Sequence, residues 1–483
     1  MVKAHKGLFL KRIAIVGLDG LDWHTLIPLI KEWKLRGFAK LLSRGILGVM
    51  KCYPPLTPPS WTSILTGVKP EKHGIWGVRK IVVEQDESIR WRLVNAFDLT
   101  YPRLNEILSS EGMFGIHVNY IDILAYPPEA QYLGNQIFVY RDPATNRRRI
   151  YPTKYESYSK YFEASDIEGI LRLNEEFVPD VLIAIFNYPD VVHHYYPNTV
   201  LNPFNRKLLE ILSKFDKLID SIYTRYDIIV IVSDHGFSFF NKGINLLSIL
   251  RQLTNGSTDF YPEFLFKLLF SKLTELVLYS LLTMNLHPAR IKLLFKTKER
   301  VFSEDLTKEV LRPYTISNSI FVDLSHSASS WSIYVVGRKL VERVYKALRK
   351  LEFFEEVHKY GLHDDIYLVH VVPKDDFYVI CEKCFEKFPE PLLRIPTARH
   401  SPYGVFIMHD KSYENVQLVN DVYNVDVVPT VLARLGLPIP SYTDGKVMIQ
   451  SSNRLARKDY RSRIMLLRKI QRLKLGLKRS YDH

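Results

Sequence analysis

The chain has 483 residues, of which 47% are hydrophobic, and a formal net charge of +14. This length exceeds the usual size of one hydrophobic core, so we expect one large domain with a substantial insertion, or two domains. Three cysteines, Cys52, Cys381 and Cys384, are too few for a disulfide scaffold and indicate a reducing compartment, by default the cytoplasm. We expect neither a signal peptide nor a transmembrane segment, since no apolar stretch is long and uncharged enough.

Short apolar runs along the chain end in acidic residues and predict buried parallel strands. These runs are residues 12–18 before Asp19, 180–187 before Asp190 and 227–233 before Asp234. A helical pattern at 205–225 lies between the second and third runs, and 403–408 followed by 425–435 predicts another strand and helix of the same layer. Ligands gather at the carboxyl ends of strands in an open α/β sheet, so the three aspartates are expected to share a site.

The pattern changes between residues 246 and 395, where long amphipathic helices precede short mixed strands. This change is typical of an inserted domain. We therefore predict a catalytic α/β core made of residues 1–245 and 396–450, an inserted cap or substrate domain at 246–395, and a basic amphipathic tail at 451–483.

The most specific motif lies in residues 54–77, which read PPLTPPSWTSILTGVKPEKHGIWG. Thr57 is followed nine residues later by Thr66-Gly67 and then by Pro-Glu-Lys-His73-Gly-Ile. This segment resembles the nucleophile region of the alkaline phosphatase superfamily, in the branch of type I phosphodiesterases/nucleotide pyrophosphatases and their archaeal and bacterial relatives. Four further motifs follow in the family's order: Leu18-Asp19-Gly20, Pro189-Asp190-Val-Val-His-His194, Ser233-Asp234-His235-Gly236 and Arg399-His400. The resemblance covers about residues 1 to 245 and 395 to 447.

The resemblance implies an alkaline-phosphatase-like α/β core with a mainly parallel sheet flanked by helices. It also implies two divalent metal ions, with zinc as our first choice and manganese as the alternative. Carried over residue by residue, the ligands of one ion are Asp190, His194 and His400, and those of the other are Asp19, Asp234 and His235 together with Thr57. The residue types agree with this, because two zinc-like ions need mixed carboxylate and imidazole ligands and an open position for substrate.

Thr57 is the expected nucleophile, and the resemblance implies a phospho-threonine intermediate. A free Thr hydroxyl is a poor nucleophile at neutral pH, so it needs a neighbouring base or a metal ion. Ser60 occupies a position where the family often has an Asn that donates to a phosphoryl oxygen, and a Ser can also donate. Pro58 has no N–H, so the backbone directly after Thr57 cannot contribute.

Several functions are compatible with this fold. Hydrolysis of a phosphodiester or pyrophosphate in a small-molecule substrate is the first choice, and phosphomonoester hydrolysis is the alternative. Leu56 precedes Thr57 where monoesterases usually have an Asp, and no Arg for the extra phosphoryl oxygens is identifiable. A sulfatase is excluded, since Thr57 cannot form the required aldehyde. A non-catalytic binding protein stays open, although it would be expected to have lost ligands.

Other candidate ligands are interpreted as structural. The Asp-x-x-x-His spacing selects His194 over His193, while His73 is expected to be a buried residue bonded to backbone and His24 a surface residue. Cys381 and Cys384 have zinc-knuckle spacing but no second ligand pair, so we expect unpaired cysteines, with a local disulfide as the alternative if the source is a hyperthermophile.

The tail, residues 451–483, carries eleven Lys and Arg against two Asp, a net +9 of the total +14. Within residues 454–479 a basic helix is predicted with one apolar stripe: Leu466, Ile470, Leu473 and Leu477. Either the helix docks this stripe on the catalytic body, or it lies on an anionic membrane surface, with the amphipathic stretch 264–284 alongside. We do not expect nucleic acid as a partner, because the tail has few aromatic residues for stacking.

Overall fold

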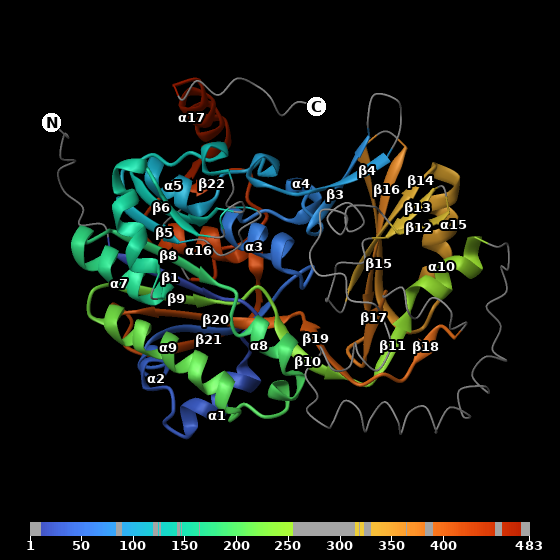
Figure 1. Ribbon diagram of the computed structural model, residues 1–483, viewed down its shortest axis with the longest axis horizontal. Coiled ribbons are helices and arrows are strands. Elements are labelled where there is room, and N and C mark those ends of the chain that lie inside the picture. The colour runs from blue at the N-terminus through green and yellow to red at the C-terminus, as the bar shows by residue number, and fades with distance from the viewer. Residues whose placement is uncertain are drawn as a thin grey trace.

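The computed structural model describes residues 11–83, 89–118, 124, 127–142, 145, 147–163, 165–254, 314–317, 319–322, 330–363, 365–381, 390–449 and 456–474. Figure 1 shows a larger α/β body beside a smaller, strand-rich part. Cys384, Leu477 and the stretch 264–284 lie outside the described residues.

The larger body is built on a nine-stranded sheet in the order β21-β2-β20-β9-β1-β8-β5-β6-β7. Its strands are β1 (Ile13–Leu18), β2 (Gly45–Lys51), β5 (Gly115–Val118), β6 (Gln136–Arg141), β7 (Arg148–Tyr151), β8 (Val181–Phe186), β9 (Ile228–Val232), β20 (Tyr403–Asp410) and β21 (Val416–Tyr423). The five strands from β9 to β6 are parallel. The expectation of a mainly parallel sheet, with buried strands at 12–18, 180–187 and 227–233, is confirmed.

The predicted strand at 403–408 is present as β20, but it runs antiparallel to both of its neighbours, β9 and β2. The reason is the direction from which the chain arrives. The preceding strand β19 (Thr397–Ser401) pairs with β10 (Gly236–Phe240), which follows the carboxyl end of β9. A chain that re-enters at that end of the sheet must run back along β9.

Helices cover both faces of this sheet. One face packs against α3 (Thr57–Thr66), α5 (Leu104–Ser110), α16 (Val427–Arg434) and α17 (Tyr460–Lys474). The other face packs against α1 (Trp23–Lys31), α2 (Arg36–Leu41), α7 (Asp166–Phe177) and α9 (Arg206–Tyr223). Burial from both sides explains why β1, β8 and β9 are continuous apolar runs.

The smaller part contains a five-stranded antiparallel sheet in the order β12-β13-β14-β16-β15. The strands are β12 (Tyr314–Ser317), β13 (Ile320–Val322), β14 (Trp331–Val336), β15 (Phe354–His363) and β16 (Ile366–Pro373), and they pack with α10 (Leu246–Thr254) and α15 (Arg338–Arg349). All five lie within the insertion predicted at 246–395. Strand β11 (Lys242–Asn245), with β17 (Phe377–Ile380) and β18 (Leu392–Leu393), forms a small sheet where the chain leaves and returns.

Aromatic side chains join the two parts near the segment that leads into Thr57. The hairpin β3 (Arg79–Val83) and β4 (Ile89–Leu93) carries Trp91, whose ring lies 4.7 Å from that of Tyr334. Tyr53, four residues before Thr57, lies with its ring 5.2 Å from His370. The smaller part therefore packs directly on the chain next to the predicted nucleophile.

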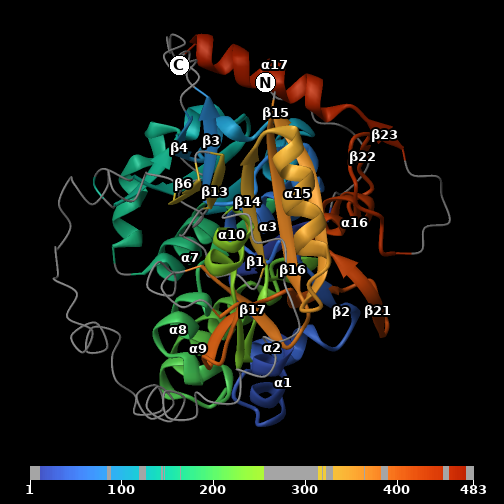
Figure 2. The ribbon, with the colours of Figure 1, turned by 90° about the vertical axis from the view of Figure 1, so that its right-hand side faces the viewer.

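The tail forms helix α17, which lies across the upper edge of the molecule in Figure 2. The helix docks on the body, but not through the apolar stripe that the first interpretation of the tail expected. The stripe residues Leu466, Ile470 and Leu473 are exposed, and the helix docks through a different face, with Tyr460 and Ile464 in the core. Among the described residues, no helix combines the length and the apolar character needed to cross a membrane.

Candidate active site

Helix α3 begins at Thr57, directly after the extended residue Leu56. Pro58 and Pro59 fit its first turn, where backbone N–H groups lack helical partners in any case, and Gly67 ends the helix in the left-handed conformation with φ 69°. The nine residues from Pro58 to Thr66 are all buried, whereas Thr57 is half-buried. Thr57 is therefore the one residue of α3 with partial access to solvent.

Three parallel strands deliver the aspartates to one place. Asp19 follows β1 directly, Asp234 lies two residues after β9, and Asp190 begins α8 (Asp190–Tyr195) four residues after β8. The backbone N–H of Asp190 donates to the carbonyl of Asp19 at 2.9 Å. Gly20, with φ +76°, permits this approach, since a Cβ there would lie 3.0 Å from Cα of Asp190.

Asp190, His194 and His400 form the first candidate metal-binding group. The Nε2 atoms of His194 and His400 are 2.8 Å apart, and they lie 3.2 Å and 3.0 Å from Oδ1 of Asp190. His194 comes from α8 and His400 from β19, segments 206 residues apart in the chain. These are the three residues assigned to one ion from the sequence.

The second group surrounds Nε2 of His235. This atom lies 3.2 Å from Oδ1 of Asp19, 3.4 Å from Oδ2 of Asp234 and 3.9 Å from Oδ1 of Asp190. Asp19, Asp190 and His235 together have ligand atoms close enough to hold an ion, so Asp190 belongs to both groups. Asp234, which the sequence assigns to this ion, lies next to His235 but is not a member of this group. All four of these buried atoms lack a hydrogen bond of good geometry. Four buried polar atoms that converge in this way fit a cation better than they fit one another.

Backbone carbonyls orient the two buried imidazoles. Nδ1 of His400 lies 3.1 Å from the carbonyl oxygen of Pro55, and Nδ1 of His235 lies 3.1 Å from that of Gly236. Carbonyls accept only, so Nδ1 of each ring carries a proton, and a bound cation would take the place of any proton on Nε2. The two rings stack with centroids 3.6 Å apart, which places the two groups side by side.

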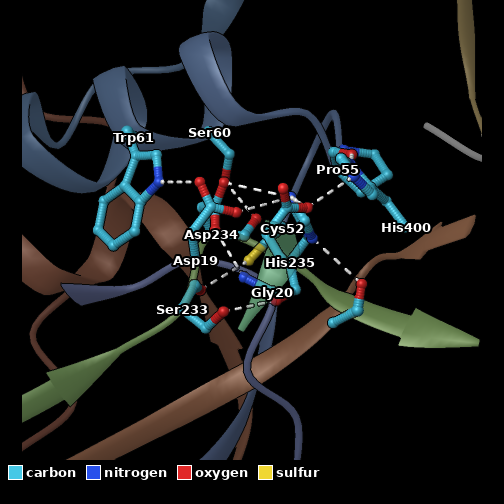
Figure 3. A network of polar contacts seen from close by, with 12 residues as sticks. Asp19, Gly20, Cys52, Pro55, Ser60, Trp61, Ser233, Asp234, His235 and His400 are labelled. Carbon is cyan, nitrogen blue, oxygen red and sulfur yellow. Dashed lines mark hydrogen bonds and ion pairs between the residues drawn. The ribbon is translucent and has the colours of Figure 1, made fainter. Parts of the chain in front are cut away.

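Helix α3 is held against these ligands by hydrogen bonds, as Figure 3 shows. Trp61 Nε1 donates to Oδ2 of Asp19 at 3.4 Å, and Ser60 Oγ donates to the backbone carbonyl of Asp234 at 2.6 Å. Together with the Pro55 carbonyl on His400, these contacts reach three of the six predicted ligands. The helix turn that begins with Thr57 is thus fixed relative to both groups.

Ser60 was assigned from the sequence to a phosphoryl oxygen, and the structure places its hydroxyl elsewhere. Ser60 is fully buried, its Oγ donates to the carbonyl of Asp234, and it accepts a hydrogen bond from Asn424 Nδ2 at 3.2 Å. In this arrangement the single hydroxyl proton is already used. Ser60 supports a ligand loop, because the inward face of α3 points at the end of β9.

The buried carboxylates of the site repel one another. The pKa of Asp19 is raised, first by burial and then by the negative charge of Asp190. The pKa of Asp234 is raised well above its ordinary value, first by burial and then by the negative charge of Asp19. Burial alone would lower the pKa of His235, but Asp234 and Asp19 raise it to about 10. No Lys or Arg among the described residues forms an ion pair with these carboxylates. Divalent cations would supply a compensating positive charge.

Two other predicted histidines have structural roles. Nδ1 of His73 accepts from the backbone N–H of Ile75 and Nε2 lies 3.1 Å from Ser63 Oγ, which confirms a buried histidine bonded to backbone. His193 is fully buried, with Nδ1 2.8 Å from Thr199 Oγ1, and it stands outside both groups. His24 is exposed, as expected.

Three residues of the site were not found from the sequence: Pro55, Trp61 and Asn424. Pro55 acts through its carbonyl, which any residue would offer, so no sequence signal exists for it. Asn424 lies in the short 3-10 helix η6 (Asn424–Asp426), far along the chain from Ser60. Trp61 lies four residues after Thr57, within the nucleophile motif, and this proximity is the one sequence signal that could have pointed to a role in the site.

The site opens to solvent on one side. The side chains of Asp19, Asp234, His235 and His400 are at most 3% exposed, whereas Asp190 is 15% and His194 29% exposed. Together with half-buried Thr57, these two residues mark the direction from which a substrate reaches the ligands.

The mainly parallel sheet, with two adjoining Asp/His groups at its strand ends, belongs to the alkaline-phosphatase-like class of α/β folds. Within that class, residues 13–380 match the family described as type I phosphodiesterase / nucleotide pyrophosphatase. The chain belongs to this family and is a phosphoric ester hydrolase. No curated protein sequence matches it significantly.

Solved structures with the same fold include two hydrolases. Phosphonoacetate hydrolase from Sinorhizobium meliloti, in complex with phosphonoformate, is 14% identical with a TM-score of 0.52, over 87% of this chain and 94% of its own. Human ectonucleotide pyrophosphatase/phosphodiesterase 5 is 12% identical with a TM-score of 0.50, over 92% and 97%. At these identities the likeness concerns the fold.

Proposed function

We propose that this enzyme hydrolyses phosphodiester or pyrophosphate bonds in a small-molecule substrate through a phospho-threonine intermediate on Thr57. The observation that carries the proposal is the attachment of α3 to the candidate metal ligands. Pro55, Ser60 and Trp61, all within four residues of Thr57, contact His400, Asp234 and Asp19 respectively.

Six side chains would hold two divalent ions: Asp190, His194 and His400 on one, and Asp19, Asp234 and His235 on the other. Zinc is the first candidate and manganese the second, since a mixed set of three imidazoles and three carboxylates suits zinc. When bound, such ions supply Lewis acidity that activates the Thr57 hydroxyl and neutralises negative charge on the phosphoryl group.

The chain's own residues carry the remaining steps. Thr57 Oγ bonds to phosphorus while the bond from phosphorus to the leaving oxygen breaks, and the proton lost by Thr57 is balanced by one taken up by the leaving group. Water then attacks the phospho-threonine, which releases the product and restores the hydroxyl. The fixed first turn of α3 limits the motion of Thr57, so less entropy is lost on reaching the transition state.

A diester is the better-matched substrate. A phosphomonoester dianion carries more charge than a diester, and enzymes that bind it need additional cationic groups. The carboxylates of the site pair only with histidines among the described residues. Cys52 is a buried free cysteine, which suits a reducing location, and we propose the cytoplasm.

The test compares the full-length protein on bis-p-nitrophenyl phosphate, p-nitrophenyl phosphate and phosphonoacetate, each with added zinc or manganese. We expect a higher kcat/KM for the diester. A higher kcat/KM for p-nitrophenyl phosphate than for the diester would contradict the proposal and favour the phosphomonoesterase alternative. Release of phosphate from phosphonoacetate alone would point to the activity named for the bacterial structural relative.

A further inference from the structure

Helix α17 has two chemically different faces, and only one of them packs on the protein. On the inner face, Tyr460 and Ile464 are fully buried and belong to the core that also contains side chains of α5 and α16. Arg468 is 1% exposed and makes a two-pronged ion pair with the buried carboxylate of Glu106, at 2.7 Å and 2.5 Å. These contacts fix the rotation of the helix on the body.

The outer face presents three large aliphatic side chains to solvent. Leu466, Ile470 and Leu473 are 58%, 39% and 70% exposed, and their spacing of four and three residues places them in one row along the helix. Exposed apolar residues are ordinary when single, but three in a row on a helix that is already docked form a patch with no internal use.

Cations flank this row. The sequence of α17, YRSRIMLLRKIQRLK, contains six Lys and Arg and no acidic residue. At 100° per residue, Arg463 lies on one side of the aliphatic row and Lys469 on the other, and both are exposed. Arg463 donates a hydrogen bond to the backbone carbonyl of Ser110 and forms an ion pair with Glu111. Within the part of the chain that the structure describes, Lys469 has no such hydrogen bond or ion pair with the body.

We propose that the outer face of α17 binds the surface of an anionic lipid bilayer. An aliphatic row with basic residues along both borders suits the head-group boundary, where the row enters the acyl region and the long basic side chains reach the lipid phosphates. A nucleic acid would use the cations and leave the aliphatic row exposed to water. Because α17 is already folded and docked, binding does not require the helix to form.

The position of α17 says which substrates such binding favours. In both ribbon views α17 lies along the upper edge, whereas α8, which carries Asp190 and His194, lies in the lower half. A bilayer against α17 would therefore not cover the candidate active site. On the proposed function, the substrate then comes from the aqueous phase rather than from the lipid that holds the enzyme.

The experiment is co-sedimentation of the full-length protein with vesicles of phosphatidylcholine alone and of phosphatidylcholine with phosphatidylglycerol. Two variants remove the features that carry the proposal: Lys469→Gln, and the double variant Leu466→Ser/Leu473→Ser. Matched controls are Lys34→Gln and Leu418→Ser, which remove an exposed lysine and a 79% exposed leucine elsewhere on the body. Hydrolysis of a soluble diester and the melting temperature are recorded for each variant, so that loss of folding or of the proposed function is seen separately.

We expect sedimentation with the anionic vesicles only, weakened by salt. Lys469→Gln should weaken it about fivefold and the double leucine variant more than about tenfold, with both controls unchanged. Equal binding to neutral vesicles, no binding to either kind, or equal losses in the controls would overturn the proposal. Binding of the wild type to a DNA oligonucleotide but not to vesicles would do the same in favour of nucleic acid.

Discussion

The side-chain nitrogen of Asn424 lies 3.2 Å from Ser60 Oγ, although 364 residues separate the two in the chain. Ser60 passes this contact on to the carbonyl of Asp234, so a short chain of hydrogen bonds runs from η6 through α3 to a candidate metal ligand. Ser60 is 0% exposed and Asn424 is 4% exposed, so these hydrogen bonds are shielded from water.

Ser60→Ala should therefore weaken metal binding by about 10- to 100-fold, as is usual for residues that orient a ligand. Activity should recover when metal is added in excess, and Asn424→Ala should act in the same direction with a smaller effect. Metal affinity is measured by competition with a chelator, and Thr62→Val, which replaces a buried hydroxyl elsewhere on α3, is the control. Unchanged metal affinity with a lower kcat at saturating metal would instead support direct contact between Ser60 and the phosphoryl group.

Thr57→Ala should abolish turnover while metal content stays intact, because all six candidate ligands remain. Thr57→Ser should keep part of the activity, since the hydroxyl persists. Single-turnover kinetics and elemental analysis on the same preparations measure the two quantities. Activity above a few per cent in the alanine variant would exclude Thr57 as the nucleophile.

Asp234→Asn and His400→Ala should each lower the metal stoichiometry, because each removes a proposed ligand of one of the two ions. His193→Ala and His73→Ala should leave it unchanged, since both imidazoles bond elsewhere. Elemental analysis of folded protein gives the stoichiometry. If His193 and His194 substitutions lowered it equally, the choice of His194 as the ligand would have no support.

Chelation should lower the melting temperature of the wild type. An ion present at a hundredfold excess over its dissociation constant stabilises the folded state by about 3 kcal/mol through mass action. Scanning calorimetry with and without a chelator measures the shift. His400→Ala should show a smaller shift than His193→Ala, and equal shifts would mean that the chelator acts at another site.

Arg468→Met should destabilise the protein by about 3 kcal/mol, because it removes the cation that is hydrogen-bonded to the buried Glu106 carboxylate and leaves only Arg103 nearby. Lys469→Met, one position along and exposed, is the control and should change stability little. Urea unfolding measures both. Near-equal stabilities would mean that the ion pair does not fix α17 to the body.

The same pair predicts a pH dependence. Burial alone would raise the pKa of Glu106, but Arg468 holds it below its ordinary value. A depressed pKa contributes stability that is present above the ordinary value of about 4.3 and is lost as the pH falls through the folded pKa. The stability difference between wild type and Arg468→Met should therefore shrink below about pH 4. A difference that is constant from neutral to acidic pH would contradict this assignment.

The sequence determined the strands and the ligand types of this protein. Continuous apolar runs at β1, β8 and β9 predicted buried parallel strands, and the acids that follow them had to meet, because the carboxyl ends of parallel strands share one edge of a sheet. The motif spacing placed Thr57 and the six ligand candidates, and it favoured His194 over its neighbour. The strands are confirmed because hydrophobic periodicity is a property of the chain itself, whereas the roles of Thr57 and the ligand candidates stay predictions.

Other features were decided only by the tertiary structure. The direction of β20 depends on where the chain re-enters from the insertion, and the role of Ser60 depends on Asn424 and the Asp234 loop, which no local pattern links to it. In α17 the sequence showed an apolar stripe but not which face would be covered. The body offers Glu106 and an apolar bed, so Arg468, Tyr460 and Ile464 turned inward and the leucines stayed exposed. Which of two usable faces is buried is set by the charge and shape of the surface it meets, and that surface exists only once the distant segments have folded together.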